Sequence, residues 1–373
     1  MQKLGDKRYE RETIIFVFSN LREMDWIRAV ISDTSINFDI SIVSLYPNEQ
    51  AWVARLKSPN VFVTNIQFNK PKDIFRVAIG LFKDLGRNKS RLIVAHGFYS
   101  SIAAIIAGKL RFKTRIVTVR HHGRGHYETP VLYRLDRFIS HFSHRVVAIS
   151  ELTKKLLLSE GVPSDKIIVI PNAIDVLKFS TPAGNPREVV LGNFGFNDSH
   201  FVIGVLSRFV DWKGIRYSLE AFSRILETNP EARLVLVNSN AKNDLLDGMI
   251  EKIGHRYIFK IDEVEDIPAF YSSLDVFVHT PISFDAEPFG LVYLEGLASG
   301  TNCIFTLSGV ALDLEQLERF AWLVDYNSAK EIENSINLVI QGESREKIPA
   351  DYLSDFTIES YLRQFREFIN NVL

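Results

Sequence analysis

Short apolar runs rich in β-branched residues alternate with helical patterns along this chain, and this alternation restricts its fold more than any other feature. In the first half the runs are 13–18, 40–45, 61–64, 92–95, 115–119, 146–149 and 167–170. Each has the length and composition of a buried strand. Buried strands that are joined through helices form parallel sheets, so this half predicts a doubly wound α/β domain.

The same pattern starts again after 182–186, a polar stretch that contains proline and glycine. The runs there are 202–206, 233–238, 257–260, 276–279, 301–305 and 321–324. We therefore expect two tandem doubly wound, Rossmann-like domains, at 1–180 and 181–355. Such sheets bind ligands at the carboxyl ends of their strands, so a cleft between the two domains is the expected site.

The composition is that of a globular protein. The 373 residues are 46% hydrophobic, which is enough for two separate cores. We see no charged leader with an apolar core and cleavage site, and no apolar stretch close to the roughly 20 residues that span a bilayer. Cys303 is the only cysteine, which excludes an intrachain disulfide and a cysteine-based zinc site. We expect a protein of the reducing cytoplasm.

Charge is divided unevenly along the chain. Residues 1–180 contain 28 Lys and Arg against 16 Asp and Glu, and the remainder contains 16 against 29. A basic half suggests an anionic partner such as a membrane surface, a phosphorylated acceptor or nucleic acid; attraction between the two domains explains it equally well. The stretch 70–91 stands out as a basic amphipathic helix. It fits an anionic bilayer surface, or it is an ordinary surface helix packed on its own domain.

The segment 287–295 is the most informative about function. Its two carboxylates, Glu287 and Glu295, flank a Pro-Phe-Gly turn that opens an expected helix. Glycine lets the backbone approach a ligand, so free amides would face an anion; these are the amides of Gly290, Leu291 and Val292. Carboxylates accept hydrogen bonds from sugar hydroxyls, and the segment therefore fits a nucleotide sugar. The alternative is an ordinary core helix with two solvent-facing glutamates.

Two cations follow the first expected strand of the second half. Arg208 and Lys213 leave the loop after 202–206 at a spacing that lets both reach over the carboxyl end of the strand. Arg offers a planar fork to paired phosphate oxygens and Lys offers a compact charge, so together they would neutralise a diphosphate. A solvated loop is the alternative, and the assignment depends on the other segments.

At this point the chain resembles a known family, the retaining nucleotide-sugar glycosyltransferases of family 4, which have the GT-B fold. Three segments carry the resemblance: 207–214, 287–300 and 146–175. The first two are specific in combination, and the third is a structural signature that leads into the interdomain linker. The resemblance is good over roughly 146–306 and much looser before that.

The resemblance implies a donor site in the second domain. Arg208 and Lys213 would bind the donor diphosphate and stabilise the leaving nucleotide. Glu287 would hold hydroxyls of the donor sugar, and Glu295 those of the ribose. The sugar and the distal phosphate would meet the amides of Phe289, Gly290, Leu291 and Val292. In such enzymes Arg and Lys replace a metal ion, and the leaving phosphate deprotonates the acceptor, so no metal, cofactor or protein nucleophile is required.

In the first domain, the segment after the fifth expected strand is rich in histidine and arginine. Similar enzymes place a histidine against the transferred sugar; His121 is the first match and His122 the second. Arg120 and Arg124 would grip an anionic acceptor. Three neighbouring histidines also suggest a metal, but no Asp or Cys stands at a convincing spacing. His96, at another strand end, would line the cleft or form a structural turn.

Three positions depart from the family pattern. The loop 19–23 lacks the glycine pair that many relatives present to donor and acceptor. Asn238 and Ala173 stand where glycine is usual in relatives. Asn172, which precedes Ala173 in the linker, is kept as a substrate-binding candidate. None of these positions is an expected donor residue, so we expect intact donor chemistry.

Aromatic residues recur at near-helical intervals at the end of the chain: Phe356, Tyr361, Phe365 and Phe368. In the GT-B fold the last helix crosses back to the first domain, and 356–373 resembles that helix. A helix that ends on its own domain is the alternative.

We therefore expect a retaining, metal-independent hexosyltransferase that moves a sugar from a UDP- or GDP-linked donor to a glycan or lipid-linked acceptor. Synthesis of surface polysaccharide or lipopolysaccharide fits this activity. The protein would be peripheral at the inner face of the plasma membrane, through 70–91, without a nucleic-acid partner. A non-catalytic nucleotide-sugar-binding protein of the same fold is one alternative. A glycosidase is another, but it explains neither Arg208 and Lys213 nor the tandem domains.

Overall fold

The computed structural model describes residues 11–19, 24–45, 58–88, 90–111, 114–123, 130–181, 187, 192, 195–197, 199–239 and 241–373. Contacts divide the chain into two compact units. The first unit combines Met1–Ala173 with Ile358–Leu373, and the second unit is Ile174–Thr357. The sequence places these boundaries at 180/181 and 355/356.

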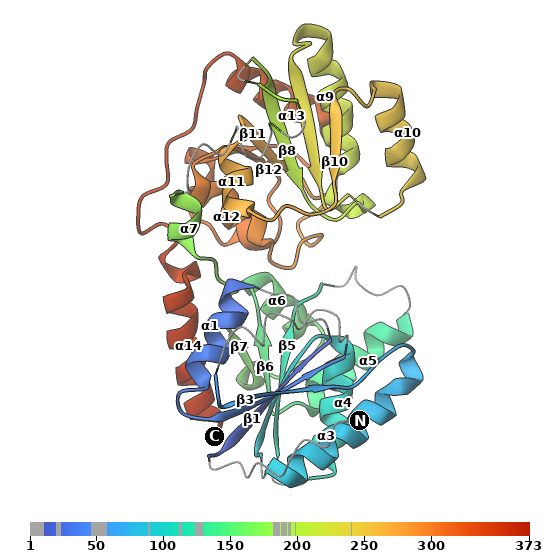
Figure 1. Cartoon of the computed structure of the whole chain (residues 1–373), viewed down its shortest axis with the longest axis vertical. Coiled ribbons are helices and arrows are strands. Elements are labelled where there is room, and N and C mark those ends of the chain that lie inside the picture. The colour runs from blue at the N-terminus through green and yellow to red at the C-terminus, as the bar shows by residue number, and fades with distance from the viewer. Residues whose placement is uncertain are drawn as a thin grey trace. The chain divides into compact units, whose positions relative to one another are not determined.

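The first unit is built on a parallel sheet with the strand order β3-β2-β1-β4-β5-β6-β7 (Figure 1). The strands are β1 (Thr13–Phe18), β2 (Asp39–Ser44), β3 (Val61–Asn65), β4 (Leu92–His96), β5 (Arg115–Arg120), β6 (Arg145–Ala148) and β7 (Ile167–Val169). β1, β2 and β4 are buried along their whole length because helices cover both faces of the sheet.

Helices from both ends of the chain cover this sheet. They are α1 (Asp25–Thr34), α3 (Ile74–Asn88), α4 (Phe98–Lys109), α5 (Pro130–Phe142), α6 (Glu151–Ser159) and α14 (Ile358–Val372). α4 packs against α3 and α5 on one face, while α14 packs against α1 on the other (Figure 1). The rings of Phe16 and Phe365 are 6.1 Å apart, and Arg366 Nε donates to Asp33 Oδ2 at 2.7 Å. The last helix therefore belongs to the first unit.

The second unit has a parallel sheet with the order β10-β9-β8-β11-β12-β13. The strands are β8 (Phe201–Leu206), β9 (Ala232–Val237), β10 (Ile258–Ile261), β11 (Val276–His279), β12 (Asn302–Phe305) and β13 (Trp322–Leu323). The helices are α7 (Val176–Ser180), α9 (Ile215–Thr228), α10 (Asp244–Ile253), α11 (Ile267–Ser272), α12 (Leu291–Ser299) and α13 (Ala329–Ile340). Apolar side chains of α9 face the core at every third position: Leu219, Phe222 and Ile225 are fully buried.

In both sheets the strand order reverses beside the first strand. β1 lies between β2 and β4, and β8 lies between β9 and β11. The predicted fold of two tandem doubly wound, Rossmann-like domains is confirmed. Such sheets bind ligands at the carboxyl ends of the strands where the order reverses, so a site is expected beyond β8 and β11 and beyond β1 and β4.

β9 ends one residue earlier than predicted. Asn238 leaves the strand in the left-handed region, with a φ of 61°. Asparagine adopts this conformation more readily than most side chains, which explains how it replaces the glycine usual in relatives.

α3 forms within the basic stretch 70–91 and has two different faces. Val77, Leu81 and Leu85 are buried in the core, whereas Phe75 and Ile79 are 64% and 56% exposed. The helix is thus packed on its own domain and also presents apolar side chains outwards. Within the described ranges, no helix combines the length and the hydropathy that crossing a bilayer requires.

Candidate functional site

The candidate site of the second unit lies where two loops leave neighbouring strands. β8 ends at Leu206, and the chain continues through Arg208 into the short 3-10 turn Asp211–Lys213. β11 ends at His279, and its loop leads through Glu287 to α12. Parallel neighbours present their carboxyl ends at the same edge of the sheet, so the two loops lie together.

Gly214 brings these loops into contact. It has a φ of 71°, and a Cβ atom at this position would collide with the carbonyl oxygen of Thr280. Nearby, the amide of Ile282 donates to the carbonyl of Trp212 at 3.1 Å. Any larger residue at 214 would force the loops apart, so glycine is what allows Lys213 to reach the β11 loop.

Lys213, Glu287 and His279 form a cluster at this edge. The Lys213 ammonium donates to Glu287 Oε2, and the two side chains are only 10% and 12% exposed. His279 Nε2 lies 3.4 Å from the same oxygen. The imidazole is held by ring contacts, with its centroid 4.8 Å from that of Tyr293 and 6.4 Å from that of Phe277. Both partners of Glu287 use Oε2, and Oε1 accepts no hydrogen bond from the described residues.

The cluster contains one ion pair and one neutral ring. Burial opposes ionisation of Glu287, but the neighbouring His279 and the charge of Lys213 outweigh burial and lower its pKa to about 2. Burial is also the main cause that lowers the pKa of His279. His279 was not among the predicted site residues, although a histidine at a strand end was the signal that pointed to His96 and His121.

The amino end of α12 lies beside Glu287. Gly290 precedes the helix with a φ of 84°, and a Cβ atom there would lie 2.8 Å from Glu287 Cγ. No side chain caps this end, so the amides of Leu291 and Val292 are available to an anion. Pro288 lies in the turn that precedes the helix.

Residues after β12 hold this turn, and the sequence did not point to them. Val310 donates its amide to the carbonyl of Phe289 at 2.7 Å, and the hydroxyl of Ser308 accepts from the amide of Glu287 at 3.0 Å. The Phe289 side chain is buried. Residue 289 therefore offers only its backbone groups to a ligand.

The other two predicted donor residues have different partners. Arg208 is exposed, and its guanidinium lies 5.6 Å from the ring centroid of Trp212. Glu295 is half-buried in the second turn of α12 and accepts a hydrogen bond from the Tyr271 hydroxyl at 2.9 Å. Burial and the charge of Glu295 raise the pKa of Tyr271, so its hydroxyl remains a donor. Of the four predicted donor residues, Lys213 and Glu287 pair directly with each other in the structure. Arg208 and Glu295 are not part of that pair.

Two histidines meet at the carboxyl edge of the first sheet. His96 ends β4 and His121 follows β5, and His96 Nδ1 lies 3.0 Å from His121 Nε2. The Trp26 ring lies 6.2 Å from each imidazole. Burial lowers the pKa of His121 to about 4, and burial with the neighbouring His121 holds the pKa of His96 well below its usual value. Both rings are neutral at pH 7.

Arg120 and His122 lie in a buried ionic cluster. Arg120 Nη2 donates to Glu160 Oε1 at 3.0 Å and Nη1 pairs with Asp136, with side-chain exposures of 3%, 0% and 5% for the three residues. His122 Nε2 lies 3.4 Å from Asp136 Oδ2, and its carbonyl accepts from Arg120 Nε at 3.1 Å. The prediction that Arg120 grips an anionic acceptor is therefore wrong, because its charge is neutralised inside the domain. The cluster instead holds the segment that carries His121.

The remaining predicted residues are Arg124, the loop 19–23 and Asn172. Arg124 and most of the loop 19–23 lie outside the described residues. Asn172 is buried in the linker, at 8% exposure. Among the residues that the structure describes, no group of three or more His, Cys, Asp or Glu side chains is placed to hold a metal ion.

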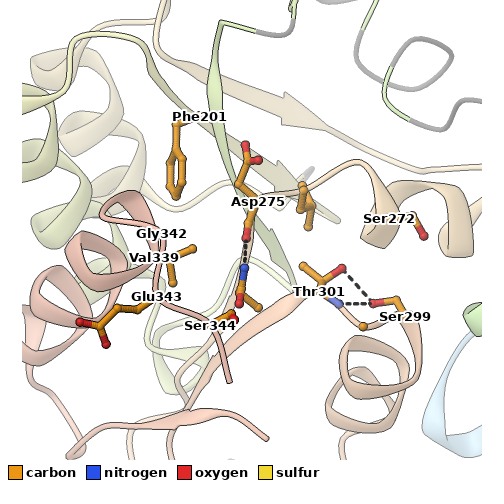
Figure 2. Close-up of a pocket in the computed structure, with 12 residues that line it drawn as sticks. Phe201, Ser272, Asp275, Ser299, Thr301, Val339, Gly342, Glu343 and Ser344 are labelled. Carbon is orange, nitrogen blue, oxygen red and sulfur yellow. Dashed lines mark hydrogen bonds between the residues drawn. The ribbon is translucent and has the colours of Figure 1, made fainter. Parts of the chain in front are cut away.

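A cavity of about 530 Å³ opens at the other end of the second sheet, where its strands begin (Figure 2). Phe201 and Asn302, the first residues of β8 and β12, line it together with Asp275. The Asp275 carboxylate is already satisfied, since it accepts from the Val202 amide at 2.7 Å and from Arg187 at 3.0 Å. None of the predicted site residues lines this cavity, and we assign the cavity no part in the site.

Comparison with known proteins agrees with this architecture. Residues 187–352 match the family model described as glycosyl transferases group 1, and residues 43–177 match glycosyltransferase family 4. An uncharacterized glycosyltransferase of Methanocaldococcus jannaschii is 26% identical over 192 residues, which is 50% of this chain; the chain spans about half, 48%, of that protein's length. The UDP-Gal:alpha-D-GlcNAc-diphosphoundecaprenol alpha-1,3-galactosyltransferase of Escherichia coli is 26% identical over 273 residues, with 70% of this chain and 69% of that protein covered.

Solved structures share the fold. HepE of Anabaena, in complex with UDP and glucose, superposes with a TM-score of 0.82 at 18% sequence identity, over 97% of this chain and 100% of that one. Two doubly wound domains, each matched by a glycosyltransferase model, define a glycosyltransferase with the GT-B fold. More narrowly, the two matches together cover residues 43–177 and 187–352, which is most of the chain, and identify it as a glycosyltransferase of the family 4 type, as its motifs predicted.

Proposed function

We propose that this protein is a retaining glycosyltransferase that moves a sugar from a nucleotide diphosphate sugar to a glycan or lipid-linked acceptor. The observation that carries the proposal is the cluster of Lys213, Glu287 and His279 beside the uncapped start of α12. It combines a cation for the diphosphate, an acceptor for sugar hydroxyls and backbone amides for anionic oxygens.

Donor binding is proposed to change the partner of Lys213. In the structure its ammonium pairs with the single charge of Glu287. A diphosphate offers more negative charge, so the ammonium would turn to the phosphate oxygens while His279 keeps its contact with Glu287. Glu287 would then accept from the donor sugar through Oε1. Arg208, exposed on the neighbouring loop, would supply the second cation.

Glu287 is proposed to position the donor rather than to transfer protons. A pKa of about 2 keeps it ionised at neutral pH, whereas a general acid needs a raised pKa. A glycosidase needs one protonated carboxyl group beside an ionised one, and the low pKa of Glu287 with the hydroxyl bound to Glu295 gives no support to that alternative.

In the proposed reaction the bond between the anomeric carbon and the distal phosphate breaks, and the leaving nucleotide diphosphate keeps the electron pair. The acceptor hydroxyl attacks the anomeric carbon from the face that the leaving group departs from, so the configuration is retained. The hydroxyl passes its proton to a phosphate oxygen. Lys213, Arg208 and the α12 amides stabilise the charge that develops on the leaving group, which is the role that a metal ion has in other enzymes.

The first unit is proposed to serve the acceptor. His121 is neutral and half-buried beside His96, so it suits a hydrogen bond to an uncharged sugar hydroxyl. A lipid-linked acceptor is supported by the name of the E. coli relative, which specifies a diphosphoundecaprenol-linked sugar. Synthesis of surface polysaccharide or lipopolysaccharide at the inner face of the plasma membrane, with the basic stretch 70–91 near the lipid, would follow.

A thermal-shift screen of nucleotide sugars, followed by a transfer assay, tests the proposal. A true donor raises the apparent melting temperature by mass action. We expect a UDP- or GDP-linked sugar to do so, and release of nucleotide diphosphate to require an added glycan or lipid-linked acceptor. Donor binding without turnover on a broad acceptor panel would show a binding protein instead, and hydrolysis of a nucleotide-free glycoside would show a glycosidase.

A further inference from the structure

The outer face of α5 carries apolar side chains in one line. Val131, Leu135, Phe138 and Phe142 are 69%, 36%, 54% and 41% exposed, and we call these four residues the α5 stripe. Their spacing places them above one another along the helix. The rings of Phe138 and Phe142 touch, with centroids 4.2 Å apart. Single exposed apolar residues are ordinary, but a continuous line of them marks an interaction surface.

Basic side chains flank the α5 stripe along one side of the helix and at its carboxyl end, and the acid of the helix is buried. Among the described residues, the exposed basic ones on or beside α5 include Lys109, Arg134, Arg137 and His141. The Lys109 ammonium lies 5.8 Å from the ring centroid of Phe142. Asp136 is the only acidic residue in the sequence of α5, and it is buried against Arg120. The outer face of the helix is therefore apolar and positively charged.

The adjoining helices continue this character. α4 packs against both α5 and α3, and the three helices lie along the same side of the sheet (Figure 1). α3 exposes Phe75 and Ile79. Exposed basic residues accompany them on and just before α3: Lys72, Arg76 and Lys83. The basic and apolar surface thus extends beyond the single segment 70–91 to which the sequence pointed.

We propose that the α5 stripe docks on an anionic lipid bilayer, with Phe138 and Phe142 at the acyl chains and the surrounding basic groups at the headgroups. The charges favour this occupant over a second copy of the chain. Two copies packed through this face would bring basic groups together without a carboxylate of α5 between them, and like charges at an interface are costly. An anionic bilayer supplies both the opposite charge and an apolar interior.

Docking through α5 would bring the acceptor side of the first unit to the lipid. On the inner side of the helix, Asp136 pairs with Arg120, the residue before His121. The helix that touches the bilayer thus also holds the strand end that carries His121. The inference does not depend on sugar transfer, because vesicle binding is measured without donor or acceptor.

Flotation of the full chain with vesicles tests this surface. Phosphatidylcholine vesicles with and without phosphatidylglycerol serve as the anionic and neutral membranes. We expect binding only to the anionic vesicles, weakened about tenfold or more by Phe138→Ser/Phe142→Ser. Lys109→Gln/Arg134→Gln should weaken it by roughly tenfold as well, since each basic group near the surface contributes to attraction. Raised salt should weaken the wild type in the same direction.

Leu245→Ser is the matched control. Leu245 is 54% exposed on α10 of the second unit, next to the acidic Asp244, so its loss should leave vesicle binding unchanged. Circular dichroism melts check that each variant is folded. Equal binding to neutral and anionic vesicles, or binding that ignores the Phe138→Ser/Phe142→Ser change, would overturn the proposal. So would a dimer in sedimentation that this double change converts to monomer, since the face would then join two copies.

Discussion

His96 in the first unit and His279 in the second occupy equivalent places in their sheets, but they have different kinds of partner. Each ends the strand that lies beside the first strand of its sheet, where the strand order reverses. Burial lowers the pKa of both rings. His96 faces a second neutral imidazole, His121, whereas His279 faces the carboxylate of Glu287, which Lys213 neutralises.

This difference shows that the sheet sets the place of a site while the loops set its charge. In both units the strand ends put a buried imidazole at the reversal of strand order. In the second unit the close approach at Gly214 adds an ammonium and a carboxylate; in the first unit the segment after β5 adds another ring. We therefore expect the second unit to bind the charged donor and the first to bind uncharged hydroxyls.

The largest expected effect is that of Lys213→Ala, which removes the charge on which the contrast depends. We expect kcat/KM for the donor to fall by roughly 10²- to 10³-fold, because the ammonium stabilises the leaving diphosphate. Steady-state kinetics with saturating acceptor measure this. Wild-type turnover in the variant would refute the assignment, and a rise in KM with unchanged kcat would limit Lys213 to binding.

Glu287→Gln sharpens the contrast by keeping the shape of the side chain and removing its charge. We expect affinity for the nucleotide sugar to fall by roughly ten- to a hundredfold, as for the loss of a hydrogen bond to a charged group. Affinity for the free nucleotide diphosphate, which has no sugar, should change little. Equal losses for both ligands in calorimetric titrations would mean that Glu287 does not contact the sugar.

Stability as a function of pH should show the titrations of His121 and Glu287 in separate ranges. The folded pKa of His121 is about 4 against an ordinary 6.5, so the unfolded chain takes up the proton first and stability falls as pH drops from 6.5 towards 4. The full loss is about 3 kcal/mol. Glu287, with its pKa lowered from 4.5 to about 2, contributes stability above pH 4.5 that is lost as pH falls towards 2.

Urea unfolding at a series of pH values measures both slopes. His121→Asn should flatten the fall between pH 6.5 and 4, and Glu287→Gln should flatten the fall between pH 4.5 and 2. A His121→Asn variant with the wild-type slope would show that His121 does not titrate as the buried pair requires.

The smallest effect belongs to His279, which shares Glu287 Oε2 with Lys213. His279→Leu removes the ring nitrogen that lies 3.4 Å from this oxygen, and we expect about a fivefold loss in affinity for the nucleotide sugar. His279→Gln keeps an N–H donor and should recover most of that loss. If both variants instead weaken binding of the free nucleotide diphosphate to the same extent, His279 has only a structural role.

The sheets could be predicted because strands buried on both faces leave apolar, β-branched runs in the sequence; β1 and β11 have the predicted bounds. The direct pairing of Lys213 with Glu287 could not be predicted from the sequence. The two residues are 74 positions apart and meet only because the loops approach at Gly214. His279 reads in the sequence as the last residue of an apolar strand, and its carboxylate partner comes from the following loop.

Arg120 and α5 show the limit of pattern reasoning in the first unit. In the sequence Arg120 resembles an exposed ligand-binding residue. Its partners Asp136 and Glu160 are distant in the sequence and reach it only when α5 and α6 pack. The helical spacing of the α5 stripe is visible in the sequence, but an apolar stripe normally predicts the buried face. Here Ile139 is buried while Phe138 is exposed, and only packing decides which side of the helix faces the core.

Lys213 is assigned to the donor diphosphate, and not merely to neutralising Glu287. Titration calorimetry of Lys213→Ala/Glu287→Gln with the nucleotide diphosphate of the donor tests this most directly, because removing both charges leaves no unpaired buried carboxylate. We predict a folded variant that binds the nucleotide diphosphate at least about tenfold more weakly than the wild type. Wild-type affinity in the double variant would contradict the assignment and leave the ion pair with a structural role alone.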